Sequence, residues 1–185
     1  MSNDQTIFHD TLSDTLDSDW TWLREQPNDW RFQDGGLEIC VRPGVKDTVQ
    51  NALLRPAPDR SEGTYAIEVT ITNTADPTQQ YEQAGITLYN NGKPIFKEVK
   101  ERIDGDLYII PGKKPMPTQS VRLRLIVTAT TWEAQYRPQD ETDYQTAATG
   151  ELPAPNNDQI SIQCYNGPEE GDHWIHFSDF CITRL

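Results

Sequence analysis

Glu82–Glu101, EQAGITLYNNGKPIFKEVKE, is the most informative stretch of this chain. It consists of two runs of strand-forming residues joined by Asn91-Gly92. Asn-Gly between two such runs is the strongest local signal for a two-residue hairpin turn. The stretch therefore predicts two antiparallel strands, and the turn determines which residues face each other across them.

An unbulged hairpin pairs Asn90 with Lys93, and because side chains alternate along a strand, every later pair follows. One face, interpreted as facing the core, is expected to hold Glu82, Ala84, Ile86, Leu88, Ile95, Lys97, Val99 and Glu101. The other face, interpreted as a polar outer surface with two aromatic residues, is expected to hold Gln83, Gly85, Thr87, Tyr89, Phe96, Glu98 and Lys100. This register separates Glu98 from the opposed Glu82/Glu101 pair, whose repulsion Lys97 could relieve.

The composition indicates one all-β domain. The chain has 185 residues, 13 prolines and 11 glycines, and its strand-forming residues occur in short runs separated by turns. The formal net charge of −13 opposes binding to nucleic acid or to an anionic membrane, so neutral sugars or cations are the more natural partners. No apolar run approaches the roughly 18 residues of a membrane-spanning helix. The sequence does not indicate an oligomeric state.

The composition of the N-terminus and the spacing of the cysteines indicate the bounds of the domain and its cellular compartment. We expect residues 1–7 to be a flexible N-terminus and residues 8–185 to form a single domain. The N-terminus has no basic region followed by an apolar run, so no signal peptide is predicted. The three cysteines, Cys40, Cys164 and Cys181, are odd in number and far apart, which favours reduced thiols and a cytoplasmic protein.

Further strands are expected throughout the chain. The clearest are Tyr65–Asn73, Val121–Ala129, Trp132–Tyr136, Ile160–Tyr165 and Trp174–Ile182. Polar and apolar residues alternate in the first two of these, which is typical of strands with one buried face. Many short strands without intervening helices predict an all-β sandwich or jelly roll.

Seven short motifs follow one another in a recognisable order. They are W-x-W-x-R-E from Trp20, NALLR from Asn51, E-Q-A-G-I-x-L-Y from Glu82, K-x-V-K-E from Lys97, V-R-L-R-L from Val121, T-x-x-A-x-Y from Thr131 and F-x-D-F-x-I from Phe177. This succession, from about Phe8 to Ile182, resembles the concanavalin A-like domains of unknown function related to the C-terminal module of bacterial β-xylosidases. Related domains have Ser-x-Asp-Gly and Trp after the sixth motif, where this chain has 137–140 and Tyr144.

The resemblance implies a two-sheet antiparallel jelly-roll sandwich of the lectin/glucanase type with a concave outer sheet face, and it implies no established activity. It also implies a structural calcium ion on the convex side. Asp179 in the last strand and Asp10 near the first match the positions of its ligands, and carboxylate oxygens suit calcium.

The leading functional hypothesis is a non-catalytic, lectin-like module that binds carbohydrate or a sugar-derived metabolite on the concave outer sheet face. Aromatic rings pack against the apolar faces of sugars, while polar neighbours hydrogen-bond to their hydroxyl groups. The candidate ligand-binding residues are Trp22, Arg24, Gln83, Thr87, Tyr89, Glu98, Lys100 and Arg124.

Two alternatives belong to other classes of protein. The first is a glycosidase or polysaccharide lyase that uses Glu82, Glu98 or Glu101. Glycoside hydrolysis needs two carboxyl groups roughly 5–9 Å apart, and the Glu-x-Asp-x-(x)-Glu run of laminarinase-type relatives is absent, which favours a binding module. The second is an intracellular regulatory or protein-interaction domain, which an exposed apolar patch would favour.

Overall fold

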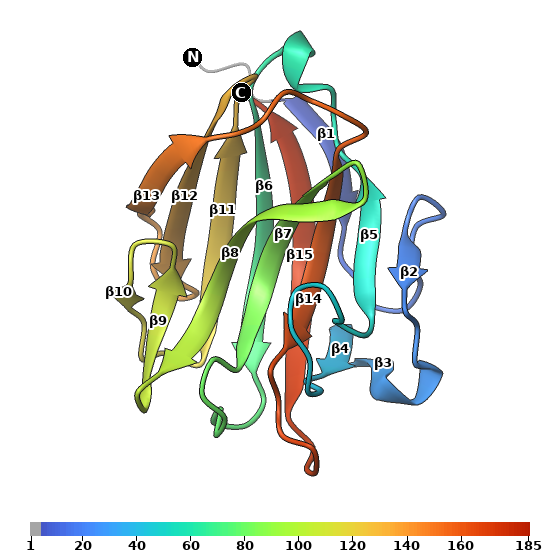
Figure 1. Ribbon diagram of the computed structural model, residues 1–185, viewed down its shortest axis with the longest axis vertical. Helices are drawn as coiled ribbons and strands as arrows, with labels where there is room; N and C mark the ends of the chain where they lie inside the picture. Colours follow the sequence, from blue (N-terminus) through green and yellow to red (C-terminus); the bar gives the residue numbers. More distant parts are fainter. Residues whose placement is uncertain (1–4) are drawn as a thin grey trace.

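Two antiparallel sheets pack face to face in the computed structural model, which describes residues 5–185 (Figure 1). The eight-stranded sheet contains β13 (Gln145–Glu151), β12 (Thr131–Pro138), β11 (Ser120–Val127), β6 (Tyr65–Asn73), β15 (Trp174–Arg184), β4 (Gly36–Cys40) and β3 (Trp30–Gln33) in this order, with β1 (Gln5–Asp10) also paired to β15. The seven-stranded sheet contains β10 (Lys114–Pro115), β9 (Asp106–Ile110), β8 (Lys93–Ile103), β7 (Gln83–Asn90), β14 (Gln159–Tyr165), β5 (Ala52–Pro56) and β2 (Thr21–Leu23) in this order. Two short 3₁₀ helices, Pro27–Asp29 and Arg60–Glu62, lie in the loops.

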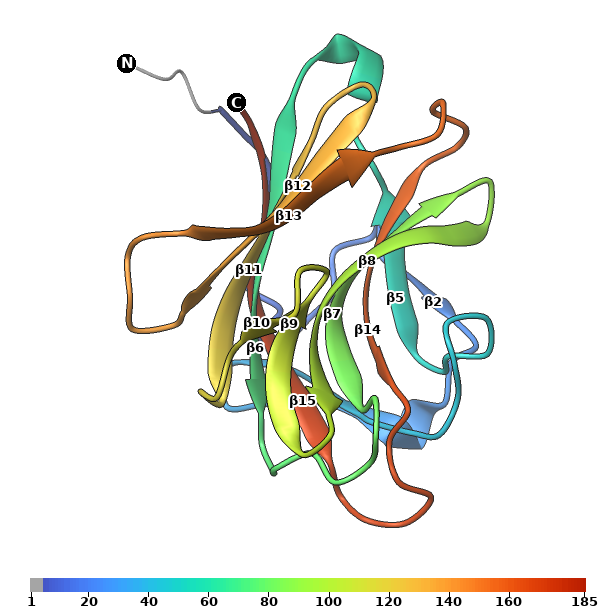
Figure 2. The ribbon, with the colours of Figure 1, turned by 60° about the vertical axis from the view of Figure 1, so that its left-hand side comes forward.

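This architecture confirms the predicted two-sheet antiparallel jelly-roll sandwich, and Figure 2 shows the two layers from the side. The first strand begins at Gln5, so residues 5–7 of the segment expected to be flexible belong to β1. Residues 1–4 of that segment lie outside the described residues. The part of the chain that the structure describes contains no helix that is long and apolar enough to span a membrane.

The inner faces of both sheets contribute to one apolar core. Ile67 and Leu123 of the eight-stranded sheet and Ile86 and Ile162 of the seven-stranded sheet have no exposed surface. These positions alternate with polar residues along each strand, as expected where one face of a sheet is buried. The core therefore fixes which face of each strand is left to form a site.

A β-bulge in the β7–β8 hairpin changes the register that the turn alone predicts. Asn90 pairs with Lys93 as expected, but the register shifts by one residue between Tyr89 and Leu88, because Ile95 is an extra residue on β8. A shift of one residue moves every later side chain of that strand to the other face. The predicted register is therefore wrong for all of β8 beyond the bulge.

The shift exchanges the charged residues of β8 between the two faces. Glu98 pairs with Ile86 and Lys100 pairs with Ala84, so both charged side chains face the interior of the sandwich. On the outer face Lys97 pairs with Thr87, and Glu101 pairs with Gln83. Ile95 did not reveal the bulge, because an apolar residue at this position also fits the unbulged alternation.

Gly85 lies where β7 and β8 approach most closely. A Cβ atom at this position would collide with the carbonyl oxygen of Glu98 and lie 2.8 Å from the Cα atom of Val99. Both contacts are with backbone, which cannot move aside as a flexible side chain can. We expect Gly85→Ala to lower the free energy of unfolding by about 1–3 kcal/mol. Chemical denaturation measures this loss, and an unchanged midpoint would contradict the close approach.

Candidate ligand-binding site

The outer face of the seven-stranded sheet is partly covered by the loop between β4 and β5, residues 41–51, which we call the covering loop (Figure 1). Val49 of this loop is fully buried in a small apolar cluster on the outer face, separate from the main core. Its neighbours there include Leu54, Tyr89 and Tyr165. The Nε atom of Arg24 donates a hydrogen bond of 2.6 Å to the carbonyl oxygen of Val49 and helps to hold the loop in place.

A cavity of about 190 Å³ lies between the covering loop and the β7–β8 hairpin. Its walls combine an apolar side from the bulged segment of β8 with polar groups from the loop and from three neighbouring strands. The lining residues are Lys46, Thr87, Pro94, Ile95, Phe96, Lys97 and Tyr165. The bulge thus has a local consequence, since it turns Lys97 outward into this cavity.

The hydroxyl group of Thr87 has no hydrogen-bond partner, although the residue is only 2 % exposed and lines the cavity. On the same face, the Nε2 atom of Gln163 is also buried without a partner. The other side-chain atom of that amide, Oε1, accepts hydrogen bonds of 3.0 Å from Tyr89 and from Ser161. Nearly all buried polar atoms in proteins are paired, so an unpaired one calls for a bound ligand or water.

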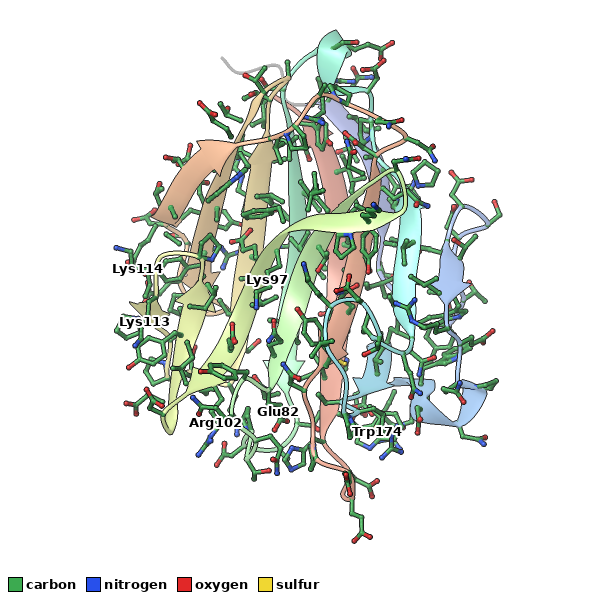
Figure 3. The ribbon with its side chains drawn as sticks, in the orientation of Figure 1. Glu82, Lys97, Arg102, Lys113, Lys114 and Trp174 are labelled. Carbon is green, nitrogen blue, oxygen red and sulfur yellow. The ribbon has the colours of Figure 1, made fainter. Side chains whose placement is uncertain are left out.

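Lys97 lies over the centre of the outer face, as Figure 3 shows. Its Nζ atom donates hydrogen bonds of 2.6 Å to Oε1 of Gln83 and 3.2 Å to Oε2 of Glu101. The Nε2 atom of Gln83 in turn donates to Oε1 of Glu101 at 3.3 Å. This network fixes the lysine side chain along one wall of the cavity.

Tyr165, the last residue of β14, forms another wall of the cavity. Burial is the main cause that raises the pKa of its hydroxyl group, and the negative charges of Glu101 and Asp47 add to the effect. The phenol is therefore protonated near neutral pH and can donate a hydrogen bond.

The structure distributes the predicted ligand-binding residues over several environments. Gln83, Thr87 and Tyr89 do lie on the outer face of the seven-stranded sheet. Thr87 lines the cavity, whereas Tyr89 is 2 % exposed beneath the covering loop and offers no stacking surface. Arg24 reaches the same side of the molecule through its contact with Val49.

Four predicted residues do not lie on this face, and each has a structural reason. Glu98 and Lys100 face the interior because of the bulge. Trp22 pairs with Leu53 and packs against the main core, with its ring centroid 4.9 Å from that of Trp30. Arg124 belongs to β11 of the other sheet, where its Nε atom lies 3.2 Å from Glu68 and its guanidinium carbon lies 5.1 Å from the centroid of the Tyr144 ring.

Lys46, Lys97, Gln163 and Tyr165 were not among the predicted ligand-binding residues. Gln163 and Tyr165 alternate with apolar residues in Ile160–Tyr165, so this alternation could have indicated an outward-facing polar row. Predicting that Lys97 lines the site would have required knowledge of the bulge. Lys46 lies in a loop that reaches the site only through tertiary packing, and no local pattern marks it.

The three glutamates of the enzymatic alternative do not share a groove. Glu98 is fully buried in the interior. Glu82 lies at one end of the sandwich (Figure 3), 2.7 Å from His173, and accepts hydrogen bonds from the backbone amides of Thr78 and Gln79. Glu101 is paired with Lys97 on the outer face. This arrangement provides no acid/base pair from these residues.

The carboxylates expected to bind calcium are occupied by other groups. Asp10 accepts hydrogen bonds from the backbone amide of Leu12 at 2.8 Å and from the indole of Trp20 at 2.9 Å. Asp179 lies 2.7 Å from His9 and 2.9 Å from Arg122, whose guanidinium also binds its carbonyl oxygen at 2.6 Å. Both carboxylates are thus engaged by protein donors, and calcium binding by this pair stays a prediction. Among residues 5–185, no three His, Cys, Asp or Glu side chains gather into a metal-binding group.

Comparison with known proteins finds similarity in fold and none in sequence families. No family model matches this chain, and no curated protein matches its sequence. Among solved structures, the chain is similar to the Bacteroides ovatus xyloglucan PUL GH43B protein, with a TM-score of 0.75 and 16% identity over 96% of this chain and 39% of that one. It is also similar to the GH43 protein BlXynB of Bacillus licheniformis, with a TM-score of 0.73 and 17% identity over 100% of this chain and 39% of that one.

A third similar structure is a xylan β-1,4-xylosidase from Bacillus halodurans, with a TM-score of 0.70 and 11% identity over 95% of this chain and 39% of the xylosidase. The chain thus spans 39% of the length of each of these proteins. The predicted resemblance to a concanavalin A-like module of bacterial β-xylosidases is confirmed at the level of the fold.

Proposed function

We propose that this protein is a non-catalytic module that binds carbohydrate in the cavity between the covering loop and the β7–β8 hairpin. The observation that carries the proposal is the unpartnered hydroxyl of Thr87, which lines that cavity while almost fully buried. A sugar hydroxyl can both donate and accept, so it satisfies such a group whichever role the threonine takes.

The walls of the cavity suit the two kinds of surface that a sugar presents. Pro94 and Ile95 supply apolar contacts for C–H groups, near the polar groups of Thr87 and Tyr165. The cavity has a volume of about 190 Å³, whereas pockets for drug-sized ligands have volumes of about 300–1,000 Å³. One sugar unit, or the end of a chain, matches this size better than a long polysaccharide.

The similar structures support a carbohydrate ligand, because they are GH43 proteins that include a xylosidase. The separate environments of Glu82, Glu98 and Glu101 favour binding without catalysis. The proposal therefore keeps the sugar ligand of the sequence-based hypothesis and moves its site to the cavity.

Thr87→Val tests the proposal, since it removes the hydroxyl and preserves the shape of the side chain. We expect a sugar identified on a glycan array to bind about fivefold more weakly by calorimetry, which corresponds to one hydrogen bond of about 1 kcal/mol. Stability should not fall, because the hydroxyl has no partner within the protein. Thr149→Val is the matched control, on an exposed position of β13.

Two results would contradict the proposal. One is a lack of binding across neutral and acidic sugars. The other is a sugar whose affinity changes equally in the Thr87 and Thr149 variants, which would place its binding site outside the cavity.

A further inference from the structure

Every polar side chain that lines the cavity can donate a hydrogen bond. Lys46 and Lys97 contribute ammonium groups, which are donors only, and Thr87 and Tyr165 contribute hydroxyl groups. No carboxylate and no side-chain amide is among the lining residues. The ammonium groups require acceptors from a ligand, and the two hydroxyl groups can donate to the same acceptors.

This excess of donors is unusual for a chain with a formal net charge of −13. Two acids, Glu101 and Asp47, lie near the cavity without lining it. Glu101 is paired with Lys97, and both Glu101 and Asp47 are close enough to Tyr165 to affect its hydroxyl group. The charges of the two lysines and the two acids cancel formally, so the direction of the donors, and not a general positive field, would select the ligand.

The two lysines differ in the hydrogen bonds that they already make within the protein. Lys97 already donates to Gln83 and Glu101 and retains one N–H of its ammonium group. Lys46 is exposed on the covering loop and makes no hydrogen bond or ion pair with residues 5–185. Its ammonium group is therefore free to contact a ligand at the mouth of the cavity.

We infer that the ligand of this cavity is an anionic sugar, whose carboxylate or phosphate group accepts hydrogen bonds from Lys46 and from the hydroxyl groups of Thr87 and Tyr165. This inference rests on the proposed function and specifies its ligand. Hydrogen bonds from an ammonium group to an anionic oxygen are shorter and about twice as strong as neutral ones. The apolar wall of Pro94 and Ile95 would then hold the sugar ring.

The experiment compares three probes of similar size by calorimetry at low ionic strength: glucose, glucuronate and glucose 6-phosphate. Each is measured on the wild-type chain, on Lys46→Met and on Lys93→Met. Lys93 is an exposed lysine beside the hairpin turn and does not line the cavity, so it controls for a general loss of one positive charge. We expect at least one anionic probe to bind more tightly than glucose, and Lys46→Met to reduce that difference about two- to fivefold.

Each outcome decides a separate point. Tighter binding of only glucuronate or only glucose 6-phosphate identifies the anionic group and supports the inference if Lys46→Met weakens it more than Lys93→Met does. Equal or tighter binding of glucose overturns the anionic ligand and leaves the carbohydrate site standing. Equal effects of the two lysine variants would also overturn the inference. If none of these probes binds and the glycan array is also blank, the inference and the proposed function both fail.

Discussion

Replacing Glu98 with methionine is expected to raise the free energy of unfolding by about 1–3 kcal/mol at pH 7. Glu98 has no exposed surface, and neither of its carboxyl oxygens has a hydrogen-bond partner. A buried polar group without a partner loses its interactions with water and gains nothing in return. Methionine fills a similar volume with an adaptable apolar chain, so the substitution removes this cost without leaving a cavity.

The gain should depend on pH, because burial raises the pKa of the Glu98 carboxyl group well above its ordinary value of 4.5. In the unfolded chain the group ionises near 4.5, whereas in the folded protein it holds its proton to a higher pH. Its contribution to stability is therefore fully present below pH 4.5 and is lost as the pH rises toward the folded-state pKa. Stability should fall by up to about 1.4 kcal/mol per pH unit in this range.

Urea denaturation from pH 4 to pH 7 measures both effects. The difference between Glu98→Met and the wild-type chain should grow as the pH rises. Glu98→Gln, which cannot ionise, should also flatten the profile, and Glu151→Gln, at an exposed position of β13, should not. Lys100 does not interfere, because burial lowers its pKa to about 8, outside this range. A variant less stable than the wild-type chain at pH 7, with an unchanged pH profile, would show that Glu98 is ionised and well solvated.

Local patterns were sufficient to predict an all-β sandwich or jelly roll, and the resemblance carried by the motif succession specified the two-sheet jelly roll. The Asn91-Gly92 turn placed the hairpin correctly, and Asn90 pairs with Lys93 as expected. Alternation predicted the inward row of Val121, Leu123 and Leu125 in β11. These features depend on neighbours along the chain or on a single buried face, and both leave a clear trace in the sequence.

The site was harder to predict, because it depends on contacts between distant segments. One extra residue at Ile95 moved Glu98 and Lys100 inward and Lys97 outward. Because both registers place charged residues on both faces, the charge pattern did not reveal the shift. Tyr89 was correctly placed on the outer face, yet Val49 of the covering loop buries it. A sequence pattern describes the faces of a strand and does not show which loop will cover one of them.

The largest loss of stability is expected for Arg60→Met. Arg60 is only 2 % exposed, and its guanidinium makes three hydrogen bonds to the β11–β12 and β13–β14 loops. Nε donates to Asp158 at 2.7 Å, while Nη1 and Nη2 donate to the carbonyl oxygens of Ala129 and Pro153 at 2.9 Å each. Removing it leaves a largely buried carboxylate and two carbonyl groups without this donor. Breaking a buried pair in this way typically costs about 3–5 kcal/mol.

Thermal unfolding should show this loss as a decrease in Tm of roughly 6–20 °C. Arg102→Met is the control, because the Arg102 side chain is partly exposed and forms no hydrogen bond or ion pair with residues 5–185. Arg60→Lys should give an intermediate value, since a lysine retains the charge and loses the planar fork. A loss no larger than that of the control would contradict the role of Arg60 in joining these loops.

Arg60 should also affect the cavity, although it does not line it. Asp158 accepts a hydrogen bond from Asn90 at 2.9 Å, and the amide of Asn91 donates to the carbonyl oxygen of Asn156 at 2.7 Å. The loop that Arg60 holds is thus bonded to the tip of the hairpin, whose next residues form the apolar wall of the cavity. Arg60→Met should therefore speed hydrogen exchange at the Asn91 amide and weaken ligand binding, while Arg102→Met changes neither. Unchanged exchange at that amide would show that the hairpin tip keeps its position without the arginine.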